Sequence, residues 1–331
     1  DDIWSQAIVN FLKDWWSSTS ILDGEAGGDN TYFYLAPHRR HGIMAGYAWE
    51  MHQTACRLEY WYTIFFRLRN TNKLPSEFLS TFLRHIIEHV WLIYSKENNI
   101  HNSNHRLQQL ASLIIATTLF NEVPSFEKIR KECLEEIKGY FQLFKARSEK
   151  ECQKLYSFNN GTLYPDGAMT EVNPVFQSYS AIMVRNVAVA TSLIDKTCKP
   201  YWENLLTRLH FWQRGIMLPD GYAPPLGQCY HKVDIMREAY LLGDFIHQSD
   251  KITQVSQSSF PKAKIKSYAG IYVMRGEKPK DKLYLMCRLG PRAYRNAADW
   301  GHIIIYAYGT ESVSYTHLRV HETSLHLVCR L

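Results

Sequence analysis

The amino-acid sequence predicts a multidomain α and β protein in which helices come first and strands follow. Through about residue 250, apolar side chains recur at helical spacing in one segment after another. From residue 262 the pattern changes to β-branched and aromatic runs separated by glycine and proline, which is typical of paired strands. A polar stretch over 248–259 separates the two patterns. We therefore predict a helical domain over 1–255 and the start of a strand domain over 256–312.

The predicted helices share an apolar stripe and are bounded by polar residues or proline. Ser76 follows Pro75 and precedes an apolar pattern, so we expect it to be the N-cap of its helix. Because the connections are short, the helices should form antiparallel hairpins. Helices are expected over 4–16, 47–69, 76–94, 107–120, 125–145, 181–193, 201–211 and 234–245.

The predicted strands lie in the stretch that carries the net positive charge of the chain. They are expected over 262–266, 270–275, 282–288 and 302–308. The net charge is +6, and residues 259–295 hold ten lysines and arginines against two acids. A basic face attracts an anion, which leaves nucleic acid, an acidic lipid surface or an acidic polysaccharide as partner.

Composition narrows the function classes. Aromatic residues make up 14% of the chain, which indicates either a large aromatic core or a groove where sugar rings stack. The longest apolar run, 110–120, is too short for a membrane span of about 20 residues. Dinucleotide, P-loop and hydrolase motifs are absent, and no nucleic-acid-binding signature accompanies the charge. The seven cysteines also have no metal-site spacing. Together, these absences lead us to predict no cofactor, no nucleic-acid partner and no integral membrane segment.

A five-residue pattern offers an alternative chemistry. His85-Ile-Ile-Glu88-His89 matches H-x-x-E-H, in which two histidines four residues apart share one helical face and can bind zinc. No third ligand can be named from the sequence. The alternative interpretation is a polar helix face, and we predict no metal.

Four motifs in a fixed order carry the main functional signal. They are NSNHR at 102–106, PDGAMTEVNPVFQSY at 165–179, PDGYAPPLG at 219–227, and LGP leading to Asp299 over 289–299. With helices before strands, the chain over roughly 40–309 resembles the heparinase II/III-like polysaccharide lyases, which are related to the oligoalginate lyases.

This resemblance implies both a fold and a reaction. The fold would be an incomplete α/α toroid of helical hairpins, followed by the first strands of a truncated antiparallel β-sandwich. An acidic glycan containing uronic acid would bind between them and be cleaved by β-elimination. Asn104 would hold the sugar carboxylate, His105 would act as base or second donor, and Tyr179 would carry a proton. Substrate contacts are further expected at Arg106, Glu171, Trp49, His52, Arg292 and Arg295, although Arg106 is equally readable as a surface residue.

Two departures from the family pattern leave an alternative open. Phe176-Gln177 stands where the family has Tyr-His, so Tyr179, three residues on, is the remaining proton carrier. The run from Arg295 to Asp299 keeps only the aspartate of the family's H-x-H-x-D. The alternative function is therefore a catalytically altered or inactive relative that binds or processes glycans in capsule or cell-wall metabolism.

The ends of the sequence suggest a fragment. The chain opens at Asp1 within helical sequence, which we interpret as the loss of a signal peptide from a periplasmic or secreted protein; a cytoplasmic protein is the alternative. Residues 313–331 look like translated adaptor read-through, so we predict a non-native tail and give it no functional role.

Overall fold

The computed structural model describes part of the chain, and the chain divides into two compact units. The described residues are 2–19, 51–69, 75–95, 104–143, 162–226, 233–234, 269–276, 283–289, 302–308 and 310–314. The first unit is Asp1–Glu135 and the second is Glu136–Leu331. This division falls inside helix α7 (Phe126–Tyr140). The boundary predicted near residue 255 lies outside the described residues and stays a prediction.

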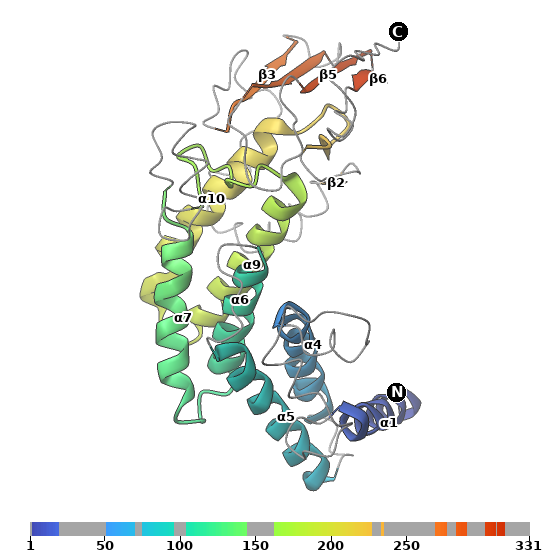
Figure 1. The fold of residues 1–331 in the computed structure, drawn as a ribbon, viewed down its shortest axis with the longest axis vertical. Helices are drawn as coiled ribbons and strands as arrows, with labels where there is room; N and C mark the ends of the chain where they lie inside the picture. The colour runs from blue at the N-terminus through green and yellow to red at the C-terminus, as the bar shows by residue number, and fades with distance from the viewer. Residues whose placement is uncertain are drawn as a thin grey trace, which may run out of the picture. The chain divides into compact units, whose positions relative to one another are not determined.

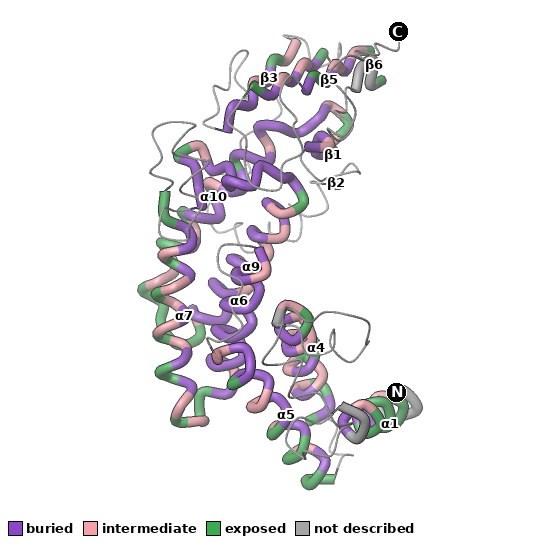
Figure 2. The backbone as a smooth tube through the Cα atoms, in the orientation of Figure 1, coloured by how far each residue is buried: buried purple, intermediate pink, exposed green. Residues whose placement is uncertain are grey.

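The first unit is helical (Figure 1). Its helices are α1 (Asp2–Thr19), α4 (Met51–Arg69), α5 (Ser76–Tyr94), α6 (Asn104–Leu119) and the first part of α7. Helix α4 packs against both α5 and α6. Helix α6 is buried along almost its whole length, as the purple tube in Figure 2 shows. A helix buried on every side is a central element of its unit.

Aromatic side chains fill the core of the first unit. Trp16 and Trp61 lie 5.3 Å and 5.8 Å from Phe82, measured between ring centroids, in tilted and edge-on arrangements. The ring centroids of Phe65 and Phe120 lie 5.4 Å apart in an edge-on arrangement. These geometries suit the ring quadrupoles and add to the burial of large apolar areas. Part of the aromatic excess in the sequence is therefore core.

The start of α5 differs from the sequence prediction. The N-cap is Pro75, which has φ −57° and ψ 139° and makes no side-chain capping bond. The carbonyl oxygen of Pro75 already accepts a hydrogen bond from the amide of Leu79 at 3.2 Å. The prediction that Ser76 is the N-cap is wrong, because the fixed φ of proline places the helix start one residue earlier. Ser76 is the first helical residue.

The second unit joins a helical pair to an antiparallel sheet. Helix α9 (Pro174–Ser192) packs against α10 (Lys199–Ile216), and the 3₁₀ helix η3 (Lys196–Cys198) links them. Strands β3 (Ile271–Arg275), β4 (Tyr284–Arg288), β5 (His302–Ala307) and β6 (Thr310–Ser314) form a four-stranded antiparallel sheet in chain order. A second pair, β1 (Tyr222–Ala223) and β2 (Val233–Asp234), is also antiparallel.

Two segments of the second unit correct or extend the predictions. Asp234 ends a strand, so the helix predicted from this residue does not begin there, and residues 235–245 lie outside the described part. Val313 and Ser314 pair with Ile305 and Ile304 in the sheet. The predicted tail thus shares its first two residues with β6, and residues 315–331 are not described. Among the described helices, none is long and apolar enough to cross a membrane.

The sheet is fixed onto the end of α10 by an arginine and a tyrosine. Arg275 Nη2 donates to the carbonyl oxygens of Gly215 at 2.9 Å and Met217 at 2.8 Å, and Tyr284 Oη donates to that of Ile216 at 2.7 Å. These bonds satisfy carbonyls that the helix end leaves without partners, at its negative pole. The Arg275 guanidinium also lies 5.0 Å from the Tyr284 ring centroid. The sheet and α10 therefore share one core.

Candidate functional site

Two histidines predicted for the site lie together in the first unit. His52 is the second residue of α4 and His105 is the second residue of α6. Their rings stack, with centroids 4.1 Å apart and planes inclined by 11°. The packing of α4 against α6 therefore brings together two residues that are far apart in the sequence.

Asn104 adds an amide to this pair. It is the first residue of α6 and is buried, and its Oδ1 atom makes no hydrogen bond to any part of the chain that the structure describes. The oxygen and nitrogen of an amide are assigned by their surroundings, so the group can present either a donor or an acceptor. The first turns of a helix also carry partial positive charge and amide groups that lack intrahelical partners. Asn104, His52 and His105 form what we call the Asn-His cluster, and its chemistry suits an anion.

Arg106 is not a surface residue. It is buried in α6, and its Nη1 atom donates to Gln109 Oε1 at 3.1 Å. The structure thus corrects the surface alternative, because α6 is covered on nearly every side. Contact between Arg106 and substrate stays a prediction.

In the second unit, Glu171 sits beside a strained backbone turn. Glu171 is buried, and the next residue, Val172, has φ 48°. Such a conformation is unusual for a β-branched residue and costs about 1–3 kcal/mol. It is maintained because the Val172 side chain belongs to the core of the unit, while Asn173 caps α9 by accepting from the amide of Val175 at 2.9 Å. The backbone on both sides of Glu171 is therefore fixed.

Gln177 has a structural role at the position where the family pattern has histidine. Its Oε1 accepts from the amide of Met169 at 2.9 Å, and its Nε2 donates to the carbonyls of Gly167 at 2.8 Å and Leu209 at 3.2 Å. The side chain is fully buried and ties the segment before α9 to α10. A side chain used in this way is not placed to carry protons to a bound sugar.

Tyr179 lies one helical turn after Phe176, as expected from the sequence. Helix α9 covers both Phe176 and Tyr179, so the two residues lie one turn apart on one face, and both are half-buried. Their roles are not tested by this arrangement. Trp49, Arg292 and Arg295, the other predicted contacts, lie outside the described residues, as does Asp299.

Comparison with known proteins supplies the family. Residues 1–243 match the family model of the heparinase II/III N-terminus. The chain belongs to the heparinase II/III family. A search of curated proteins finds no match.

Solved structures agree with this heparinase II/III assignment at the level of the fold. A heparinase III described as the BT4657 gene product matches 99% of this chain with a TM-score of 0.67 and 15% identity. The heparan sulfate lyase HepC from Pedobacter heparinus matches 95% with a TM-score of 0.62 and 15% identity. A further heparinase III matches 94% with a TM-score of 0.67 and 14% identity. The predicted fold class, toroid helices followed by antiparallel strands, is confirmed.

The chain spans about half the length of these heparinases, covering 50%, 45% and 46% of them respectively. The fold is therefore shared over the part that this chain contains.

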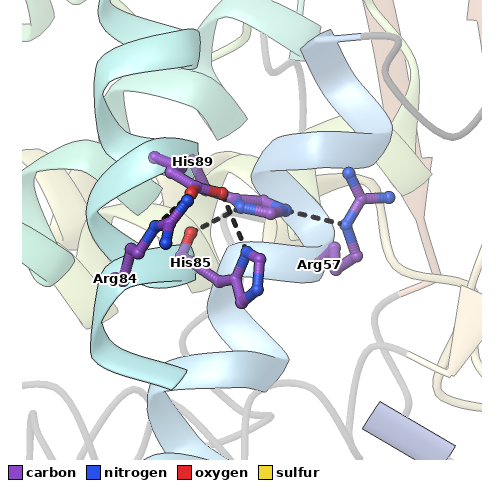
Figure 3. Close-up of polar contacts among 5 residues, drawn as sticks. Arg57, Arg84, His85 and His89 are labelled. Atoms are coloured by element: carbon purple, nitrogen blue, oxygen red, sulfur yellow. Dashed lines mark hydrogen bonds and ion pairs between the residues drawn. The ribbon is translucent and has the colours of Figure 1, made fainter. Parts of the chain in front are cut away.

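In this heparinase-family member, the H-x-x-E-H pattern forms a hydrogen-bonded core cluster (Figure 3). His85 Nδ1 lies 2.8 Å from Glu88 Oε2, and His89 Nδ1 donates to the carbonyl of His85 at 2.7 Å. Arg57 Nε donates to His89 Nε2 at 3.0 Å. The ring of His89 packs 4.3 Å from that of Trp61.

These contacts contradict the zinc alternative. Both ring nitrogens of His89 are already engaged, one as donor and one as acceptor, so neither lone pair is available to a metal. Burial, together with the nearby Arg57 cation, holds the pKa of His89 well below its usual range. Among the described residues, no group of three or more histidine, cysteine or acidic side chains is arranged to hold a metal.

We expect His85→Gln to leave zinc binding unchanged, because His85 and His89 are not arranged as ligands. The measurement is the zinc content of purified wild-type and variant proteins after incubation with equal zinc and gel filtration. Equal content supports the structural assignment. One zinc fewer per chain in the variant would restore the zinc interpretation.

Proposed function

We propose that this protein is a polysaccharide lyase that cleaves an acidic, uronic-acid-containing glycan by β-elimination. The observation that carries the proposal is the Asn-His cluster, in which an amide and two stacked imidazoles gather where α4 and α6 begin. Membership of the heparinase II/III family supports it. The solved relatives include a heparan sulfate lyase, which makes a glycosaminoglycan the first substrate to test.

The reaction explains why these residue types are needed. A base removes the proton on C5 of the uronic acid, and the C5–C4 bond becomes double as the oxygen on C4 leaves. The C5 proton is weakly acidic while the adjacent carboxylate keeps its full charge. Donors must therefore hold that carboxylate and stabilise the enolate-like intermediate, which preorganised amide and imidazole N–H groups do well.

In this proposal the residues divide the work. The amide of Asn104 holds the carboxylate, and His105 acts as base or as a second donor. Tyr179 protonates the leaving oxygen, which a phenol can do and the side chain of Phe176 cannot. Glu171, whose backbone is held in place on both sides, orients a sugar hydroxyl with its carboxylate. Further substrate contacts are proposed for Trp49, by stacking on a sugar ring, and for Arg292 and Arg295, by their positive charge. The basic stretch 259–295 favours an acidic polymer.

The proposed substrate also sets a place of action. An intact polysaccharide is too large to cross a membrane unaided, so we propose a periplasmic or secreted protein. The proposed partner is the glycan itself, with no nucleic acid.

The test is the absorbance of the product. Elimination creates a double bond conjugated with the carboxylate, and we expect a rise in near-ultraviolet absorbance with heparan sulfate, hyaluronan or alginate. The experiment uses the purified chain and, in parallel, the longest reading frame that contains it. Carboxyl-reduced heparan sulfate is the control and should give no rise. No rise with any of the three native polymers contradicts the proposal.

One observation favours a second candidate. The side chain of Gln177 is engaged in structural hydrogen bonds, and Phe176 has no exchangeable proton. These two positions therefore do not supply the proton transfer that the family's Tyr-His pair would supply. We propose, as the alternative, a relative that binds acidic glycans without cleaving them. It predicts retention on a heparan sulfate column that survives Tyr179→Phe and His105→Ala, with no unsaturated product from the wild-type protein.

A further inference from the structure

The rings of His52 and His105 are stacked face to face, which is a more ordered arrangement than a chance contact between two side chains. The two planes are nearly parallel at 11°, and the 4.1 Å separation of the centroids places one ring face directly over the other. His52 is held from its own helix as well, since Cys56 Sγ, one turn later on α4, lies 3.9 Å from His52 Nε2. The ring of His52 therefore has a supporting contact at its edge and His105 on its face.

The orientation of a histidine ring needs such support. The torsion that turns an imidazole about its Cβ–Cγ bond is broad, so the side chain alone does not determine where the ring nitrogens point. Covering one face of His105 with a parallel ring restricts this rotation and leaves the ring edge, which carries both nitrogens, for other contacts. Proton transfer and donation depend on that edge being aimed correctly.

We propose that His52 is a positioning residue that sets the plane of the His105 ring by stacking, and that it does not itself bind the sugar, in place of the substrate contact expected from the sequence. This inference rests on the proposed function, in which His105 meets the substrate. It assigns His52 a role in which its flat, aromatic shape matters and its nitrogens do not. Another aromatic ring at position 52 should then serve nearly as well.

The kinetic test compares three variants of His52 and one control variant in the absorbance assay. His52→Ala removes the stacked ring and should lower kcat by about 10- to 100-fold with little change in KM, as expected for a misaimed catalytic group. His52→Phe keeps a stacking ring without nitrogens and should recover most of the lost kcat. His52→Tyr repeats the rescue if the phenylalanine variant does not fold. Gln53→Ala, at the exposed neighbour on α4, is the matched control and should match the wild type.

The kinetic outcomes separate the possible roles of His52. Equal losses in the alanine and phenylalanine variants, with a raised KM, would show that His52 binds the sugar and would overturn the inference. Unchanged kcat in His52→Ala would also overturn it. Either result leaves the lyase function itself standing, because the wild-type protein is active in both.

A spectroscopic test examines the stacked contact without the need for activity. In protein labelled with ¹³C-histidine, the ring protons of His105 lie over the face of His52 and should show a ring-current shift. We expect His52→Ala to abolish this shift and His52→Phe to retain it. If the wild-type protein cleaves no glycan, the proposed function fails, and the His105 signals still test whether the two rings stack. Identical His105 signals in wild type and His52→Ala would show that they do not stack and would overturn the inference.

Discussion

Replacing Gly167 with alanine should destabilise the protein by roughly 3 kcal/mol or more, among the largest effects of any single substitution in the described residues. Gly167 has φ 91°, a conformation that disfavours any side chain. A Cβ atom there would overlap the backbone carbonyl of Arg208 on α10, whose carbonyl carbon would lie only 2.6 Å away. Backbone cannot move aside as a flexible side chain can. Because Gln177 ties this segment to α10, the strain should also displace Glu171.

Urea unfolding of wild type and Gly167→Ala measures this effect through the midpoint and slope. Gly139→Ala is the matched control, because Gly139 lies within helix α7, where alanine is the better helix former. We expect the control to unfold at the same or a higher urea concentration. A Gly167→Ala protein within about 0.5 kcal/mol of wild type would show that the segment does not lie against α10 as described.

Removing the amide of Asn104 should lower turnover by about 100- to 1,000-fold, the usual cost of losing one donor to a developing oxyanion. Asn104 is the only member of the Asn-His cluster with an amide, and its Oδ1 atom has no partner among the described residues. In Asn104→Ala the substrate carboxylate would keep its charge, and the C5 proton would stay difficult to remove. The unfolding midpoint should change little, because the bond lost is one to substrate.

Asn104→Asp separates a functional from a structural role. Aspartate at the start of α6 interacts favourably with the helix dipole, so the folded state should be as stable as wild type or more so. Its carboxylate would repel that of the uronate, so activity should fall as far as in Asn104→Ala. Measurement of kcat/KM and of the unfolding midpoint on the same preparations tests both expectations. An active Asn104→Asp protein would show that the amide is not the donor.

The helices were predictable to the extent that their apolar periodicity was local. The core helices α4, α5 and α6 agree with the prediction within a few residues where they are described. Helix α9 begins at Pro174, seven residues before the predicted start at Ala181. Asn173 followed by proline is a strong signal for a helix start, and this cap places the start of α9 earlier than its apolar periodicity does.

The candidate site shows where sequence patterns stop being informative. The contact between His52 and His105 depends on how α4 packs against α6, which no spacing along the chain encodes. The H-x-x-E-H pattern has correct zinc spacing, yet Arg57 from another helix occupies the nitrogen that a metal would need. Gln177 stands where the family pattern has histidine, but its hydrogen bonds join the segment before α9 to α10, so its role is structural.

The mass of the cleavage product distinguishes β-elimination from hydrolysis. A heparan sulfate or hyaluronan oligosaccharide of defined length is incubated with the protein, and both new ends are analysed by mass spectrometry. β-Elimination leaves the fragment on the reducing side of the cut with an unsaturated uronate at its new non-reducing end, one water lighter than the hydrolysis product, and no oxygen is taken up from isotopically labelled water. We expect this lighter fragment from the wild-type protein, and its loss in Asn104→Ala. Fragments that carry solvent oxygen, or an uncleaved oligosaccharide, would contradict it.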